Sequence, residues 1–288
     1  MIRMIIDGIV VALLAVVVTL SVVTWKKAGT LEVQLAVVQK GLKDTNKKLS
    51  DAEAHAKPGD SAKSQGAHDT PHWAYEGEMN PAEWGKAFPV CGTGHAQSPV
   101  DIQGPFEKAV HPLKLDYKPM PLKVLNNGHT IQATVSPGST LTVNGVVYDL
   151  LQFHFHRPSE EHVNGKPSAM VAHFVHKSAA GKLAVVGVLL NEGKENPVVR
   201  SIWANAPRSE APEVAVAGAE INPASMLPSR LEYYSFEGSL TTPPCTEGVT
   251  FYILKTSTDV SRAQIDAFPF KLNARPVQPL NGRKIAAN

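Results

Sequence analysis

Histidines at alternate positions of two short apolar segments are the residues whose spacing could most directly do chemistry. His154 and His156 lie in residues 152–156, and His173 lies in residues 171–176. Side chains alternate between the two faces of a strand, so His154 and His156 point the same way. A neighbouring antiparallel strand can bring His173 opposite them, because cross-strand partners approach within about 5 Å. Three imidazoles on one face would form a site for a d10 metal ion with an open fourth position.

The alternative is that these are ordinary histidines satisfied by hydrogen bonds. Phe153, Phe155 and Phe174 occupy the opposite faces, so both segments are predicted to be buried strands. The turn-forming residues 164–167 separate them. A buried imidazole without a partner costs free energy, and a metal ion would satisfy it. The surrounding sequence therefore favours the metal site.

Length and composition indicate what must position these residues. The chain has 288 residues, of which 43% are hydrophobic and 19% charged, enough for one large domain with extensions or for two small domains. The 22 prolines and 21 glycines indicate many turns, as in a β-rich fold. The net charge is +2, and no stripe of basic residues interleaved with aromatics is present, so no nucleic-acid partner is expected.

The N-terminal residues 1–27 predict a membrane segment. Residues 9–25 carry no charge and are followed by Lys26 and Lys27. This length approaches the roughly 20 residues of a membrane helix. A cleaved signal peptide, giving a secreted protein, is the alternative, but no small-residue cleavage site closes the run. We expect an uncleaved signal anchor in the inner membrane, since large domains often translocate in spite of flanking positive charge.

Residues 28–55 predict an amphipathic helix with heptad spacing. Its apolar seam steps alternately by four and three residues: Leu31, Leu35, Val38, Leu42, Thr45, Leu49 and Ala52. A single helix that continues from the membrane and a homo-oligomer formed through residues 31–52 are both compatible with this pattern. Residues 56–71 are small and polar and predict a linker. The folded domain is then expected over residues 72–288.

Cys91 and Cys245 are the only cysteines. They do not form a CxxC motif, and one pair in an exported domain predicts a disulfide. Closing so long a loop would stabilise the fold by about 4–5 kcal/mol on the chain-entropy view. Two inert thiols in a cytosolic protein are the alternative. Together with the signal anchor, the pair predicts a domain that faces the periplasm or the exterior.

From His72 onward, a series of motifs resembles the α-class carbonic anhydrases of bacterial type. The motifs, in order, are HWAY (72–75), QSPVDI (97–102), NNGH (126–129), QFHFH (152–156), HFVH (173–176), GSLTTPPC (238–245) and NARPVQPL (273–280). The resemblance implies a mainly β fold, with a central, twisted, mostly antiparallel sheet and short peripheral helices. It also implies a zinc site at the bottom of a cone-shaped cavity.

The resemblance implies reversible hydration of carbon dioxide to bicarbonate and a proton. Zn²⁺ would be the cofactor and His154, His156 and His173 its ligands, with zinc hydroxide attacking the substrate carbon. In this enzyme class zinc is known to lower the pKa of its bound water to about 7.

Three further residues acquire catalytic roles through the resemblance. Thr241 would accept a hydrogen bond from the hydroxide and donate its own to Glu160. Glu161 stands where relatives often have histidine and is the second candidate for that carboxylate. His129 would export the proton, since the unperturbed pKa of histidine is about 6.5.

The resemblance also implies a substrate pocket and supporting contacts. The pocket residues would be Val175, Val185, Leu240, Thr242 and Val249, for which ordinary core packing is the alternative. Gln152 would hold His154, and the carbonyl of Asn273 would hold His156. Many relatives have glutamate two residues before the third ligand, where this chain has Val171. We therefore expect His173 to lack an acidic partner and zinc to be retained less firmly.

Two other functional classes stay open at this stage. One is a catalytically silent binding domain on the same fold, although such proteins have typically lost a zinc-binding histidine. The other is a membrane-tethered assembly protein that depends on residues 31–52.

Overall fold

The fold was taken from a computed structural model, in which residues 71–288 are described. The predicted anchor (1–27), the heptad segment (28–55) and the linker up to residue 70 lie outside the described residues. Within residues 71–288, no helix combines the length and the apolar character needed to cross a membrane.

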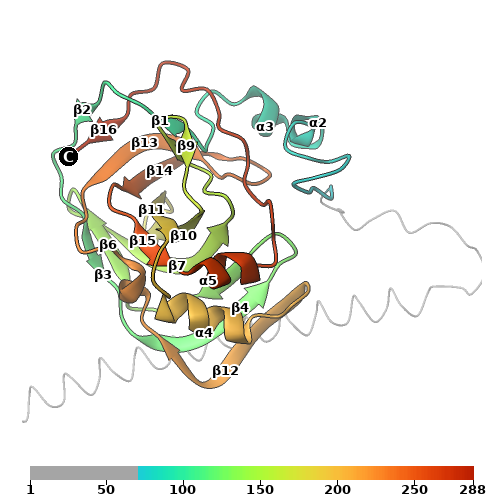
Figure 1. The fold of residues 1–288 in the computed structure, drawn as a ribbon. Coiled ribbons are helices and arrows are strands. Elements are labelled where there is room, and N and C mark those ends of the chain that lie inside the picture. Colours follow the sequence, from blue (N-terminus) through green and yellow to red (C-terminus); the bar gives the residue numbers. More distant parts are fainter. Residues whose placement is uncertain (1–70) are drawn as a thin grey trace, which may run out of the picture. The chain divides into compact units, whose positions relative to one another are not determined.

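One large sheet of 13 strands forms the body of the described region. Its centre consists of three long neighbours, β7 (Val146–His156), β10 (Met170–Ser178) and β11 (Leu183–Glu192). Beyond β7 the order continues with β5 (Ile131–Thr134), β4 (Met120–Asn126) and β12 (Ala211–Ile221). Beyond β11 it continues with β14 (Glu247–Leu254), β13 (Tyr233–Ser239), β16 (Ala286–Ala287) and β2 (Glu107–Lys108). Figure 1 shows these strands.

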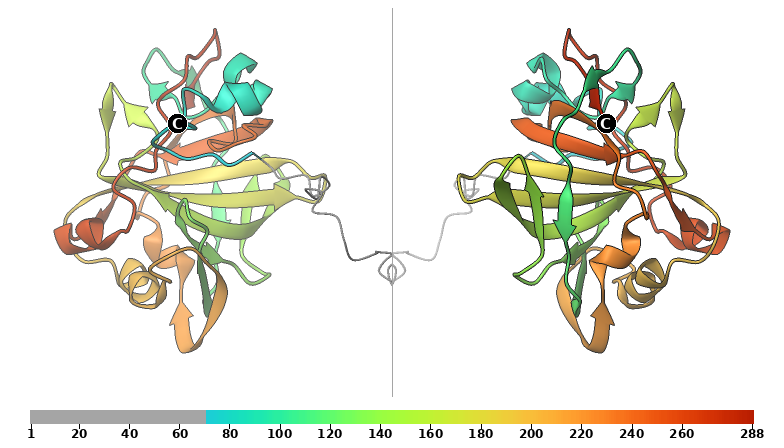
Figure 2. Two further views of the ribbon diagram at one scale, coloured as in Figure 1. Left: turned by 90° about the vertical axis from the view of Figure 1, so that its right-hand side faces the viewer. Right: turned by 90° about the vertical axis from the view of Figure 1, so that its left-hand side faces the viewer.

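The remaining elements are short. Off the main path lie β3 (Lys114–Asp116), β6 (Thr140–Val143) and β15 (Thr258–Val260). A separate small sheet contains β1 (Asp101–Ile102), β8 (His162–Val163) and β9 (Lys166–Pro167). The helices are α2 (Trp84–Ala87), α3 (Pro89–Thr93), α4 (Pro197–Asn205), α5 (Arg262–Ala267) and the 3-10 turn η1 (Pro223–Met226). In Figure 2, α2 and α3 lie on one side of the long central strands, and α4 and α5 lie on the other.

The predicted mainly β fold with short helices is confirmed, but the sheet is mixed. Around β7 and β10 the strands are antiparallel, as expected. In contrast, β11 runs parallel to β14 and β15, and β16 runs parallel to β2. Parallel neighbours require a crossover connection, and the chain between β11 and β14 includes α4, η1 and two further strands. The twist of the long strands is evident in Figure 2.

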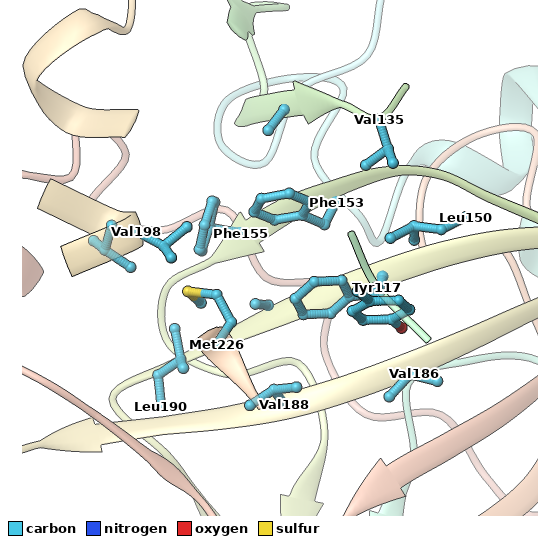
Figure 3. Close-up of a cluster of buried hydrophobic side chains, with 14 of the residues drawn as sticks. Tyr117, Val135, Leu150, Phe153, Phe155, Val186, Val188, Leu190, Val198 and Met226 are labelled. Carbon is cyan, nitrogen blue, oxygen red and sulfur yellow. The ribbon is translucent and has the colours of Figure 1, made fainter. Parts of the chain in front are cut away.

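The central strands β7 and β10 separate two environments. Phe153, Phe155 and Phe174 are completely buried on one face, within the main hydrophobic core. Phe153 stacks on Phe174 with ring centroids 4.9 Å apart. Figure 3 shows Phe153 and Phe155 among the aliphatic side chains of this core. Because side chains alternate along a strand, the intervening histidines are placed on the opposite face.

A second, smaller apolar cluster lies on the histidine side of these strands. It includes Val171, Val185, Val249, Phe251 and Ile253, with Val175 and Leu240 packed against it. A third cluster contains Trp84 and the disulfide between Cys91 and Cys245. The predicted disulfide is therefore confirmed. It ties α3 to the loop that precedes β14.

Candidate metal centre

The three histidines meet on one face of the β7–β10 pair. His173 is the direct cross-strand partner of His154, and His156 lies one alternation further along β7. The ring centroids are 5.0 Å apart for His154 and His156, 5.6 Å for His154 and His173, and 5.0 Å for His156 and His173. One nitrogen from each ring lies within 4.8 Å of the other two. The predicted convergence of the three imidazoles is confirmed.

Two of the rings are oriented by oxygen acceptors. The Oε1 atom of Gln152 lies 2.9 Å from His154 Nδ1, and the carbonyl oxygen of Asn273 lies 2.7 Å from His156 Nδ1. A ring nitrogen that faces such an acceptor carries the proton, which leaves Nε2 of both rings with a free lone pair. The structure thus places Gln152 and Asn273 in contact with the rings for which the sequence proposed them.

His173 is held in the opposite sense, by Glu161. Its Nε2 lies 3.1 and 3.0 Å from the two carboxylate oxygens, so its Nδ1 is the free nitrogen. The expectation that His173 lacks an acidic partner was therefore wrong. Val171 supplies no carboxylate from β10, but the loop after β7 supplies one.

The donor set fits zinc. Among the described residues, the buried Nε2 of His156 has no hydrogen-bond partner. Desolvation, and then the charge of His173, lower the pKa of His154 to about 3 and that of His156 well below its usual value. Both rings are therefore neutral at physiological pH. The carboxylates of Glu161 and Glu160 raise the pKa of His173 against the effect of burial, and a bound metal ion would replace the proton on its Nδ1. The three imidazoles would then form the ligand set of catalytic zinc sites that keep a fourth position open.

Glu160 lies directly beside this centre and is almost completely buried. Its Oε1 accepts a hydrogen bond from the backbone nitrogen of Arg275 at 2.9 Å. Its Oε2 lies 3.4 Å from His156 Nε2 and 3.7 Å from His173 Nδ1. Burial raises the pKa of Glu160 to about 7, against the opposing effects of His173 and of the nearby Thr241 hydroxyl. The structure therefore brings together the carboxylate, the threonine and two of the ligands.

A cavity of about 140 Å³ leads to the histidines. His154 and His156 lie in its wall, as do His129 and Thr242. Comparison with known proteins identifies this arrangement, since residues 79–288 match the family model of eukaryotic-type carbonic anhydrases. The chain belongs to this family. Its activity is the reversible hydration of carbon dioxide to bicarbonate, and zinc is its cofactor.

Individual carbonic anhydrases align with this chain over nearly their whole length. The enzyme of Pectobacterium carotovorum is 42% identical over 229 residues, which span 77% of this chain and 93% of that protein. The enzyme of Neisseria gonorrhoeae is 44% identical over 232 residues, which span 78% of this chain and 90% of that protein. The solved α-carbonic anhydrase of Photobacterium profundum is 42% identical with a TM-score of 0.71, and the match covers 75% of this chain and 100% of that one.

His129 lies at the cavity wall of this carbonic anhydrase, on the turn that precedes β5. The Oδ1 atom of Asn127 accepts hydrogen bonds from the backbone nitrogens of His129 and Thr130, which fixes the turn. The imidazole stacks on Trp73, with centroids 3.7 Å apart and planes 11° from parallel. Burial, aided by the charge of His72, lowers the pKa of His129 below its ordinary value.

The residues expected to hold carbon dioxide divide into two groups. Val175, Val185, Leu240 and Val249 belong to the second apolar cluster. Val175 and Val185 are cross-strand partners between β10 and β11. Thr242 is instead part of the cavity wall.

Sequence reasoning missed several cavity residues. Trp73 and Tyr75 lie in its wall, and both belong to the HWAY motif that carried the resemblance. Gln132 also lies there, because it is the cross-strand partner of His154 on β5. The alternation of strand residues could have indicated its face, but not which strand would lie beside β7.

Proposed function

We propose that three groups around the zinc triad divide the catalytic work of this carbonic anhydrase. Thr241 and Glu160, here called the orienting pair, aim the attacking oxygen, and His129 exports the proton. The observation that carries this proposal is the placement of both members of the pair beside the triad, with His129 in the wall of the same cavity.

Zinc held by three neutral imidazoles supplies a positive charge that makes hydroxide available near neutral pH. The orienting pair then fixes direction. The positive charge of bound zinc would lower the pKa of Glu160 from the value of about 7 that burial gives it. An ionised carboxylate only accepts hydrogen bonds, and Glu160 already accepts one from the backbone of Arg275. The single hydroxyl proton of Thr241 is thereby directed toward Glu160. Its oxygen is left to accept from the attacking group, whose lone pair then points at the substrate carbon.

His129 receives the proton that each cycle releases. It lies on a turn at the cavity wall, so its ring communicates with the solvent in the cavity and with the outside. A histidine whose pKa lies near neutral pH both accepts and releases protons at physiological pH. Stacking on Trp73 holds the ring at the wall, and its lowered pKa favours release of the proton to buffer.

Carbon dioxide has no net dipole and needs an apolar surface beside the nucleophile. The second apolar cluster lies on the ligand-bearing face of β10 and supplies Val175, Val185, Leu240 and Val249. Thr242 supplies a polar edge from the cavity wall. We assign these five residues to substrate binding.

The setting of the enzyme is also part of the proposal. The disulfide indicates an oxidising compartment outside the cytoplasm. Residues 1–27 would anchor the chain in the inner membrane, and residues 28–55 and 56–71 would connect the anchor to a periplasmic domain of residues 72–288. The heptad pattern of residues 31–52 supports a homo-oligomer. Secretion after signal cleavage is the alternative, and N-terminal sequencing of the purified protein distinguishes the two.

Stopped-flow hydration of carbon dioxide tests the assignment of the shuttle. His129→Ala should slow turnover about 10-fold or more in dilute buffer while zinc content stays constant. Added imidazole should restore part of the rate, because it replaces the missing proton acceptor. Unchanged turnover in dilute buffer would remove His129 from the mechanism without affecting the zinc site.

A further inference from the structure

Glu161 is a buried carboxylate aimed at a single imidazole. It is completely buried, and both of its oxygens face Nε2 of His173 at 3.1 and 3.0 Å. Within residues 71–288, no other side-chain hydrogen bond or ion pair reaches this carboxylate. A buried charge is retained only where it is paired, so the contact with His173 accounts for the presence of Glu161 at this position.

The loop that carries Glu161 is fastened to the strand that carries His173. The Ser159 hydroxyl donates to the carbonyl of Glu161 at 2.7 Å and accepts from the backbone nitrogen of Ser168 at 2.8 Å. The backbone nitrogen of Ser159 also donates to the carbonyl of Ser168 at 3.1 Å. Ser168 lies two residues before β10 begins. The carboxylate is therefore held at a fixed position relative to the ring it contacts.

Position 171 on β10 faces the same way as His173. Val171 lies one alternation before His173, opposite His156 on β7, and it is completely buried in the second apolar cluster. A longer side chain at this position would extend over the face that the His173 ring occupies. The strand thus offers a second position from which a carboxylate could reach the same imidazole, and this chain uses it for packing.

We propose that Glu161 is the positioning residue of His173, and that positions 161 and 171 are interchangeable sources of its carboxylate. Glu161 accepts the hydrogen bond from Nε2, which fixes the tautomer and turns Nδ1 toward the metal. The proposal rests on the zinc site described above. It assigns zinc retention to a loop residue, although residue 171 lies on the same strand and the same face as His173.

Zinc release from the full-length protein, without turnover, tests this. The zinc-loaded protein in detergent is mixed with excess chelator, and the release rate is followed. Glu161→Leu removes the acceptor and should release zinc about 10–100-fold faster than the wild type. Glu161→Gln keeps the volume and one acceptor oxygen but loses the charge, and a smaller acceleration is expected.

The decisive comparison adds a carboxylate on the strand. Glu161→Gln combined with Val171→Glu should return zinc release to within about threefold of the wild type, since the ring regains a charged acceptor. The matched control, Glu161→Gln with Val171→Gln, has the same volume without the charge and should stay fast. A residue that only filled space would respond equally to both double variants.

Two results overturn the proposal. One is release from Glu161→Leu and Glu161→Gln at the wild-type rate. The other is equal release from the two double variants. If circular dichroism shows that Glu161→Leu does not fold, the comparison of the two double variants that contain Glu161→Gln still tests the proposal. A wild-type protein that binds no zinc would refute the zinc site itself, and that result is distinguishable from both.

Discussion

The two faces of the β7–β10 pair are made from alternating residues of the same two segments and behave in opposite ways. On one face Phe153, Phe155 and Phe174 pack against each other and need no partners. On the other, each histidine has its own polar partner: Gln152 on the same strand holds His154, whereas Asn273 and Glu161, outside both strands, hold His156 and His173. The comparison teaches that alternation along a strand assigns residues to a face, whereas two of the three polar contacts on the histidine face depend on segments outside the strands.

The largest effect is expected from breaking the polar face. His173→Ala should abolish stoichiometric zinc binding and reduce carbon dioxide hydration by about 1,000-fold or more, because two imidazoles do not complete the site. Metal analysis and stopped-flow assays measure this. The control is His176→Gln on the same strand, where the histidine contacts the Tyr117 hydroxyl at 2.9 Å on the phenylalanine face. Loss of zinc from the control as well would contradict the conclusion that zinc binding depends on the histidine face alone.

The phenylalanine face should respond in stability instead. Phe153→Ala removes a completely buried ring and should lower the free energy of unfolding by about 3–5 kcal/mol. Denaturant titration of the zinc-free protein measures it. Under native conditions the folded variant should still bind one zinc ion per chain. A folded variant with unchanged stability would contradict the packing described for this core.

A smaller effect is expected at the orienting pair. Thr241→Val preserves the volume but removes the hydroxyl, and kcat/KM for hydration should fall about 100-fold with zinc content unchanged. The decrease would come from a less well oriented attacking oxygen, since the three zinc ligands are unchanged. Retention of full activity would show that Glu160 acts without Thr241.

The smallest effect concerns the cavity wall. His129 owes its lowered pKa first to burial, to which the stacked Trp73 contributes. Trp73→Ala should therefore raise the pKa of His129 toward its ordinary value of about 6.5, so the ring becomes protonated at a higher pH than in the wild type. Proton NMR titration of the His129 ring resolves the direction. A downward or absent shift would assign the lowered pKa to His72 instead.

Local alternation made the triad predictable. His154, His156 and the phenylalanines between them follow a period of two, and the turn after them suggested that the strand with His173 would lie alongside. The disulfide was predictable because only two cysteines exist. The parallel pairing of β11 with β14 was not, since it depends on how a long connection returns to the sheet.

The partner of His173 shows where sequence reasoning failed. Val171 correctly indicated that the strand carries no carboxylate, but Glu161 reaches the ring from the loop after β7. Neither residue reveals this contact by its spacing, because it depends on the Ser159 and Ser168 hydrogen bonds that fasten the loop. The sequence named Glu161 only as the second candidate for the carboxylate beside Thr241, and only the folded loop assigns it to His173.

The cross-link between Cys91 and Cys245 has a consequence for when this enzyme can begin to work. Cys245 follows Thr241 by four residues, and its backbone nitrogen donates to the carbonyl of Thr242 at 2.9 Å. Oxidation of the two thiols therefore limits the positions open to the loop that carries Thr241, to which we assign the orientation of the attacking oxygen. A newly made chain in a reducing environment carries every catalytic group but lacks the brace on one of them. Completion of the site therefore depends on an oxidising compartment, which supplies the oxidant for the disulfide.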